Sequence, residues 1–177
     1  MEITLFRKFF AIGICFVIFS CSHSQKTVND YQSSESKSME RQLEANKTLV
    51  LKLYSALNDT NWTDAKKLID PNFKHHYVKD SAFGVTNWNG FEKGFRMSQK
   101  AFPDWKLTPS QVVAQGEYVS VLLFGQGTHR GEFAGIPPTN RKVGAPIMLL
   151  HQIKEGKIVA DWEIMNTSSF LEQLRKE

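Results

Sequence analysis

Four segments of alternating apolar and polar residues, joined by short turns, constrain the fold of this chain more than any other feature. They cover residues 106–115, 118–129, 142–154 and 157–163. A period of two indicates strands with one buried face. Gly116-Glu117 and Glu155-Gly156 mark tight hairpin turns, which make neighbouring strands antiparallel. The second half of the chain therefore predicts an antiparallel meander.

Helical spacing dominates the chain before the strands. Apolar residues recur with a helical period from Glu44 to Leu57, and a second short helix is predicted over Trp62–Ile69. Asp70-Pro71 ends that helix, because the proline ring removes a backbone donor. The segment 72–78 then alternates like a short strand.

Two capping-box spacings predict further helices. The first, Asn89 with Glu92, opens a helix that Pro103 closes, and the second, Ser169 with Glu172, opens a short final helix. Helices on one face of a curved antiparallel sheet define an α+β cone, with a cavity between the layers.

The N-terminus predicts a secretory signal. Arg7-Lys8 precedes an apolar run over residues 9–19, which is too short to span a bilayer. The ending "IFSC" resembles a bacterial lipobox, which implies a signal peptide at 1–20 and lipid on Cys21. An uncleaved signal anchor is the alternative. The lipoprotein interpretation predicts a protein anchored in the bacterial cell envelope through Cys21.

Residues 21–43 predict a flexible tether, because they are polar and nearly free of aliphatic side chains. The domain proper is then 44–177. Cys15 and Cys21 are the two cysteines of the sequence, so the domain holds no thiol, disulfide or cysteine-zinc site. The formal charge of +4 is scattered along the chain, and we expect no nucleic-acid partner.

The stretch "GTHRGEFAGIPPTNRKV" at 127–143 carries a family resemblance. It resembles the loop signature of SnoaL-like polyketide cyclases, also called ester cyclases, of the nuclear transport factor 2-like (cystatin-like) superfamily. "AFPDW" at 101–105, "EGKIVADW" at 155–162 and "FKHHY" at 73–77 fit the same family. The resemblance covers nearly everything from Glu44 to Leu174. It implies a cone-shaped pocket and an intramolecular aldol ring closure that needs no metal or nucleotide cofactor.

The last strand departs from the family. Where the family has acidic residues, this chain has Ala160 and Asn166, and Asn166 is not a general base. Asp161 and Glu163 are the acids that remain, and their spacing puts both on one strand face, opposite Trp162. They are our candidates for acid/base catalysis; ordinary salt bridges are the alternative.

Histidines supply the other polar candidates. Adjacent residues of a strand face opposite ways, so at most one of His75 and His76 faces the pocket. The family pattern favours His76 as catalytic and His75 as substrate-binding; a solvent-facing or capping histidine is the alternative. His129 either reaches the cavity mouth or fixes the loop backbone, and we favour the second. His151 lies on a central strand, where a satisfied core histidine is the simpler interpretation. No ligand spacing supports a metal site.

A subset of the large apolar residues is predicted to line the pocket. The predicted substrate-binding set is His75, His129, Trp88, Trp105, Phe124, Met148, His151 and Asn166. Pro137-Pro138 stiffens the loop between two strands, while Gly131 and Gly135 allow its turns. This loop is interpreted as a gate of the pocket, or alternatively as a cover for two strand ends.

Two functions therefore stay open. The first is a SnoaL-like cyclase acting by acid/base chemistry on a small apolar carbonyl compound. The second is a non-catalytic envelope lipoprotein that binds a hydrophobic ligand, which Ala160 and Asn166 favour. A third class, a homodimer or scaffold joined through the outer sheet face, would show as a large exposed apolar patch.

Overall fold

The computed structural model describes residues 22–79 and 81–176. The predicted signal peptide and Cys21, the predicted lipidation site, lie outside these residues. The chain divides into two compact units, one up to Ser36 and one from Lys37 onward. The described part of the first unit, residues 22–36, is helical. The sheet, the cavities and the candidate site all belong to the second unit.

Helix α1 (Ser22–Asn58) begins well before the predicted start at Glu44. The predicted tether is therefore helical from Ser22 onward. Lys, Glu, Gln and Met in this segment are good helix formers, and these propensities outweigh the absence of a buried face. The side chains of residues 32–42 are exposed, in agreement with their polar composition. A tethering role for this segment stays a prediction.

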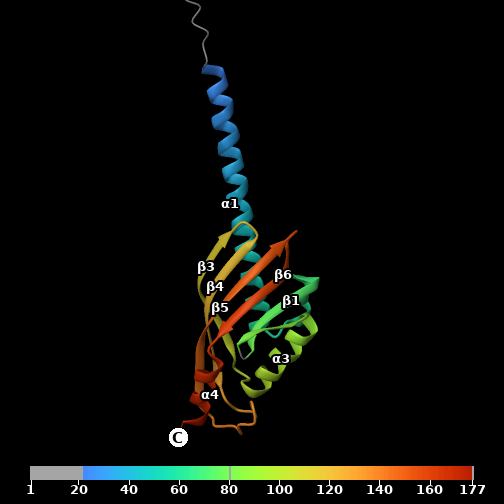
Figure 1. Ribbon diagram of the computed structural model, residues 1–177, viewed down its shortest axis with the longest axis vertical. Helices are drawn as coiled ribbons and strands as arrows, with labels where there is room; N and C mark the ends of the chain where they lie inside the picture. Colours follow the sequence, from blue (N-terminus) through green and yellow to red (C-terminus); the bar gives the residue numbers. More distant parts are fainter. Residues whose placement is uncertain (1–21, 80, 177) are drawn as a thin grey trace, which may run out of the picture. The chain divides into compact units, whose positions relative to one another are not determined.

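The second unit is built on one six-stranded sheet in the order β2-β1-β6-β5-β4-β3. The strands are β1 (Ile69–Lys79), β2 (Ala82–Thr86), β3 (Lys106–Gln115), β4 (Tyr118–Thr128), β5 (Lys142–Lys154) and β6 (Lys157–Met165). Neighbouring strands are antiparallel except β1 and β6, which are parallel. N-terminal helices pack on this curved, unclosed sheet (Figure 1). The predicted α+β class of the nuclear transport factor 2-like type is confirmed.

The strand bounds of the meander agree closely with the prediction, whereas β1 and β2 differ from it. Strand β1 starts at Ile69, and Pro71 falls where its pairing with β6 is irregular, between Ile69 and Lys74. A proline without a backbone donor is tolerated at such an irregularity. Strand β2 was not predicted, because its sequence Ala-Phe-Gly-Val-Thr is short and contains a glycine.

Both later helices begin earlier than their capping-box spacings predict. The Asn87 side chain accepts a hydrogen bond from the Gly90 backbone amide and caps α3 (Trp88–Ala101). In the same way, Asn166 caps α4 (Thr167–Arg175) by accepting from the Ser169 amide at 2.9 Å. An asparagine oxygen satisfies an amide at the helix start without any acidic partner. The asparagine therefore fixes each start, and the spacing with a later Glu does not.

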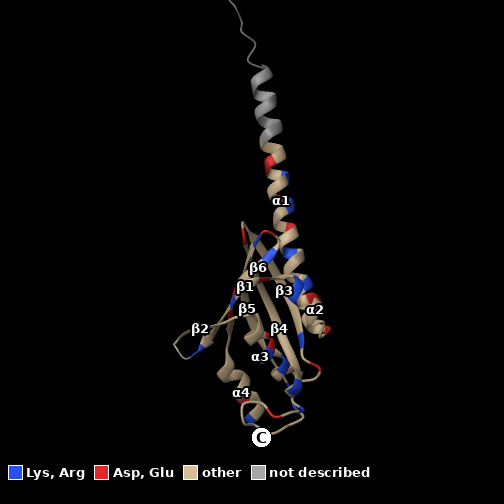
Figure 2. Cartoon of the chain, turned by 90° about the vertical axis from the view of Figure 1, so that its right-hand side faces the viewer, with Lys and Arg blue, Asp and Glu red and all other residues tan. Residues whose placement is uncertain are grey.

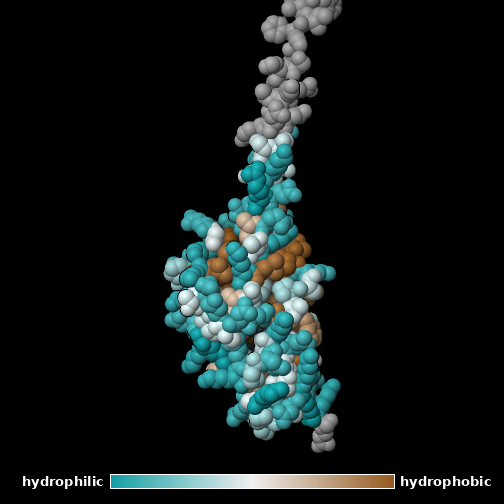
Figure 3. Space-filling model, turned by 180° about the vertical axis from the view of Figure 1, so that it is seen from behind, coloured by the Kyte–Doolittle hydropathy of each residue, from teal (hydrophilic) through white to brown (hydrophobic). Residues whose placement is uncertain are grey.

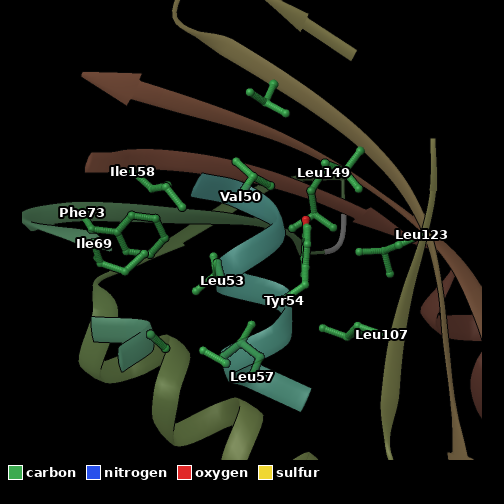
Figure 4. Packing of buried hydrophobic residues seen from close by; sticks show 14 of the residues in the cluster. Val50, Leu53, Tyr54, Leu57, Ile69, Phe73, Leu107, Leu123, Leu149 and Ile158 are labelled. Carbon is green, nitrogen blue, oxygen red and sulfur yellow. The ribbon is translucent and has the colours of Figure 1, made fainter. Parts of the chain in front are cut away.

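The core lies between the inner face of the sheet and the helices. From α1, Val50, Leu53, Tyr54 and Leu57 point toward the strands (Figure 4). Leu123 of β4, Leu149 of β5 and Ile158 of β6 meet them from the sheet. The short helix α2 (Trp62–Lys67) adds Trp62 and Ala65 to the same core. The helical period of α1 and the twofold period of the strands thus bury matching faces.

The outer face of the sheet is only partly covered. Its exposed apolar side chains include Val78, Phe83, Val85, Val113, Phe124, Met148, Leu150 and Ile164. Seen from behind, apolar surface gathers over the upper half of the unit (Figure 3). A homodimer joined through this face would need exposed apolar residues on it, and these are present. The homodimer itself stays a prediction.

Charged side chains are interspersed rather than gathered. Positions of Lys and Arg and positions of Asp and Glu are spread along the elements of the second unit (Figure 2). Within the described residues, no helix is both long and apolar enough to cross a membrane.

Candidate active site

Two acids of β6 lie on the inner face of the sheet, as their spacing predicts. Asp161 and Glu163 both line a cavity of about 220 Å³ between the sheet and the helices, which we call the main cavity. Asp161 is only 2% exposed. Glu163 is partly buried and makes no hydrogen bond to any described residue. One acid is thus held by partners, and the other is free to meet a ligand.

His75, and not His76, is the histidine that faces the acids. The parallel register pairs His75 with Asp161, and His75 Nδ1 lies 2.6 Å from Asp161 Oδ1. His76 faces the opposite side of the sheet, where it stacks on Trp162 with ring centroids 4.7 Å apart. The prediction that His76 is catalytic is therefore wrong, because strand alternation turns its ring away from the cavity.

Tyr54 and His151 form a second polar pair on the cavity wall. The Tyr54 hydroxyl lies 2.6 Å from His151 Nε2, and both side chains are buried. His151 Nδ1 lies 3.8 Å from Asp161 Oδ2 and has no hydrogen-bond partner among the described residues. His151 is thus not a fully satisfied core histidine. Tyr54, His151, Asp161 and His75 form one row of polar groups.

Burial and mutual charge set the protonation of this row. Burial, with the charges of Asp161 and Glu163, raises the pKa of Tyr54, so its hydroxyl keeps its proton. Burial lowers the pKa of His151, and nearby His75 lowers it further against the opposing effect of Asp161. Both groups are therefore neutral near pH 7 and able to share a proton.

The pKa values of Glu163 and His75 are both raised. Burial raises the pKa of Glu163, and the charge of Asp161 adds to this effect against the opposing influence of His75. For His75, burial disfavours the charged form, but the hydrogen bond and the charge of Asp161 outweigh it and raise the pKa. A carboxylate with a raised pKa is a stronger base than an ordinary one.

The rest of the main cavity is apolar. Its walls come from α1, α3, α4, the strands and the loop between β4 and β5, and include Phe95, Phe102, Trp105, Phe133 and Phe170. The prediction that Trp105 lines the pocket agrees with this wall. An apolar cavity with a few convergent polar groups is the usual form of a small-molecule site.

Several predicted substrate-binding residues lie elsewhere. Phe124 and Met148 are 44% and 49% exposed on the outer sheet face, so the prediction that they line the pocket is wrong. Alternation along β4 and β5 puts Leu123 and Leu149 inward instead. Trp88 is buried in the core beside Trp62 and Phe73 and does not line the cavity. Asn166 is exposed and serves as the cap of α4.

His129 fixes the loop between β4 and β5, as we favoured. Its Nδ1 accepts a hydrogen bond from the Thr139 amide at 3.3 Å, and its ring stacks on Phe102. At the loop tip, Phe133 and Ile136 exchange two backbone hydrogen bonds around Ala134-Gly135, both with positive φ. This is a tight turn of the hairpin type. The turn carries Phe133 into the cavity wall.

Gly131 allows the loop backbone to lie close to the end of α3, and it does not form the turn that was predicted for it. A Cβ at this position would lie 2.7 Å from the Lys100 carbonyl oxygen. The amides of Arg130 and Gly131 both donate to the carbonyl of Ala101, at the end of α3. The loop is thus joined to the helix that forms one side of the cavity.

Metal ligation has little support in this geometry. Across residues 22–79 and 81–176, no group of three or more His, Cys, Asp or Glu side chains is placed to hold a metal ion. The polar row is instead linked by hydrogen bonds between its own members.

Three residues of the cavity wall, Tyr54, Phe91 and Phe95, were not predicted from the sequence to line it. Tyr54 follows the helical period of the core, and its hydroxyl gave no separate signal. Phe91 and Phe95 lie in the helix predicted to end at Pro103, and no local signal separates a helix face that meets a cavity from one that meets the core. A tyrosine inside an otherwise aliphatic helix face is the one signal that could have found Tyr54.

A curved, open sheet covered by helices, with acids on its inner face beside an apolar cavity, defines a protein of the nuclear transport factor 2-like fold. The profile of the SnoaL-like polyketide cyclases matches residues 47–174. The chain belongs to this family, which supports a cyclase-type function.

Solved structures agree with this assignment. AclR from Streptomyces galilaeus, assigned as a hydroxylase, is 25% identical with a TM-score of 0.69, over 76% of this chain and 98% of that chain. IdmH from Streptomyces antibioticus, assigned as a polyketide cyclase, is 26% identical with a TM-score of 0.67, over 74% and 99%. TsrD from Streptomyces laurentii shares the fold at 18% identity and a TM-score of 0.64, over 74% and 95%. The comparison with curated protein sequences found no match.

Proposed function

We propose that this protein is a cofactor-independent, cyclase-type enzyme that closes a ring in a small apolar carbonyl compound by an intramolecular aldol reaction. The observation that carries the proposal is the Glu163 carboxylate. It lines an apolar cavity, makes no hydrogen bond to a described residue, and has a raised pKa. These are the properties of a general base that acts near neutral pH.

In the proposed reaction, Glu163 removes a proton from the carbon next to a carbonyl group. The Tyr54–His151 pair supplies a hydrogen bond to the oxygen that gains negative charge. The resulting carbanion attacks a second carbonyl carbon of the same molecule, which forms the new carbon–carbon bond. The alkoxide produced then takes a proton from protonated Glu163, so the base is restored and no net proton is consumed.

Asp161 and His75 have a positioning part in this scheme. Their 2.6 Å hydrogen bond lies beside Glu163 on the same sheet face. The negative charge of Asp161 favours proton uptake by Glu163, whereas a protonated His75 opposes it. The Asn166 side chain caps a helix and carries no acid or base. In this scheme the acid/base role therefore belongs to the acids of β6.

Deuterium exchange tests the first step of the proposal. Acetonaphthone, an aromatic ketone, is incubated in D₂O with the domain, and exchange of its methyl hydrogens is followed by NMR. We expect wild-type protein to accelerate exchange and Glu163→Gln to lose at least about 100-fold of that rate, the usual size of general-base catalysis. Glu155→Gln, in the exposed turn before β6, is the matched control and should keep the rate.

The alternative function is a non-catalytic binder of hydrophobic ligands. The apolar walls of the main cavity and the absence of an acid at Asn166 favour it. Acetonaphthone fluorescence measures binding, and together with the deuterium-exchange rate it separates the two functions. If wild-type protein binds the ketone but exchanges it no faster than Glu163→Gln, the domain is a binder and the enzyme proposal fails.

A further inference from the structure

A second cavity adjoins the main one at Glu163. It measures about 390 Å³ and is lined by β1, β2, β6 and α3, and we call it the side cavity. Four residues line both cavities: Phe91, Phe95, Ser98 and Glu163. A ligand lying beside Glu163 is therefore next to both spaces.

The two cavities differ in chemistry. Aromatic and aliphatic side chains form most of the wall of the main cavity, and its polar groups are concentrated on Tyr54, His151 and the two acids. The residues peculiar to the side cavity are His75, Tyr77, Thr86, Gly90 and Gly94, of which three carry polar groups. Within the described chain, the hydroxyls of Tyr77 and Thr86 make no hydrogen bond to another residue. Two unpaired hydroxyls on residues that line one space can bind a polar group of a ligand.

The charge around the side cavity disfavours an anionic group. Among the described residues that line it there is no Lys or Arg. Glu163 lies in its wall, and the proton of His75 is directed to Asp161. A ligand carboxylate here would meet a like charge without a cation of its own, which costs binding energy. An uncharged hydroxyl or amide group can instead use the hydroxyls without that cost.

Gly94 lies in the wall of the side cavity and carries no side chain to occupy it. It lies inside α3, where glycine is less favourable than alanine by about 0.5–1 kcal/mol. A Cβ built at Gly94 meets no atom within 4 Å, so no tight contact requires glycine there. Gly90 differs, since its Cβ would lie 1.9 Å from the Thr86 hydroxyl oxygen. The absence of a side chain at Gly94 therefore enlarges the side cavity without serving any close contact.

We infer that the side cavity holds an uncharged, hydrogen-bonding arm of the substrate. The substrate is then a two-part carbonyl compound. Its apolar part occupies the main cavity, its reactive carbonyl lies beside Glu163, and its arm lies among His75, Tyr77 and Thr86. This inference rests on the proposed function for the position of the carbonyl.

Three matched ketones test the inference with the intact domain. Acetonaphthone has no arm, naphthoylpropionamide carries a neutral amide arm, and naphthoylpropionic acid carries a carboxylate on the same arm. Their dissociation constants are measured by fluorescence near neutral pH. We expect the amide to bind about tenfold more tightly than acetonaphthone, as two hydrogen bonds of ordinary strength allow. The acid should bind no more tightly than acetonaphthone.

Filling the side cavity should remove this gain. In Gly94→Leu, the amide is expected to lose its tenfold advantage, while acetonaphthone keeps its wild-type affinity. Gly94→Ala is the matched control for helix propensity and should retain the advantage, and circular dichroism checks that both variants fold. Equal binding of amide and acetonaphthone by wild-type protein would overturn the inference. An equal loss for both ketones in Gly94→Leu would do the same.

The deuterium-exchange assay keeps the two proposals apart. If acetonaphthone is exchanged but the amide arm gives no gain in affinity, the side-cavity inference alone fails. If the arm gives the gain but neither ketone is exchanged, the proposed chemistry fails. The two-part ligand site then stands without it.

Discussion

His75 Nδ1 lies 2.6 Å from Asp161 Oδ1, across the one parallel strand pair of the sheet. The two residues are 86 positions apart in the sequence and occupy directly paired positions on β1 and β6. The return of the chain from β1 to β6 thus brings a histidine and an acid to the cavity wall. The protonation of this pair should govern both stability and activity.

Removal of His75 should change how stability depends on pH. Its pKa is raised above the usual 6.5, so the stability that it contributes is present below that value and is lost as pH rises through the folded-state pKa. The advantage of wild type over His75→Gln should therefore shrink above pH 6.5. Urea unfolding between about pH 6 and about pH 9 measures it. His76→Gln, with its ring on the other sheet face, is the control.

Loss of the Tyr54 hydroxyl should affect both folding and chemistry. Tyr54→Phe leaves His151 Nε2 buried without its 2.6 Å partner, which is expected to cost about 1–3 kcal/mol of unfolding free energy. The exchange rate of acetonaphthone should fall about tenfold or more, because the developing oxyanion loses a donor. Denaturation and NMR exchange measure the two effects. An unchanged exchange rate in a folded variant would remove Tyr54 from the mechanism.

Asn166 should behave as a helix cap and not as a ligand contact. Asn166→Ala is expected to lower the free energy of unfolding by about 1 kcal/mol while ligand affinity stays at the wild-type value. Asn166→Asp keeps a capping oxygen and should keep the stability. A large loss of affinity in a folded Asn166→Ala protein would return this residue to the ligand site.

The prolines of the loop should matter more for ligand binding than for stability. Pro137 and Pro138 directly follow the tight turn that carries Phe133 into the cavity wall. Replacing both with alanine loosens that turn, since the fixed φ angles are lost. Acetonaphthone affinity is expected to fall several-fold with a small change in melting temperature. Equal losses of affinity and thermal stability would contradict the gate interpretation.

The lipid anchor is tested at Cys21. If the residue is lipidated as the "IFSC" ending predicts, the full-length wild-type chain produced in a bacterium should take up radiolabelled palmitate and fractionate with membranes. Cys21→Ser should take up none and leave the membrane fraction, whereas Cys15→Ser, within the predicted signal, should still be labelled. Labelling of the Cys21→Ser protein would contradict the lipoprotein prediction.

Much of the fold could be predicted from periodicity. The twofold pattern located β3 and β5 to the residue, since each strand has one buried and one exposed face. Periodicity failed where the local sequence was ambiguous. Strand β2 is short and contains Gly84, and in its pairing with β1 the Tyr77 ring packs over that glycine.

The sequence by itself determined that Asp161 and Glu163 share a strand face, because alternation depends only on spacing. It left open which histidine they would meet, since that depends on the register between β1 and β6. Only the tertiary structure turned His75 inward and His76 outward, brought Tyr54 against His151, and left two cavities that adjoin at Glu163. These are contacts between distant segments, and packing rather than local preference decides them.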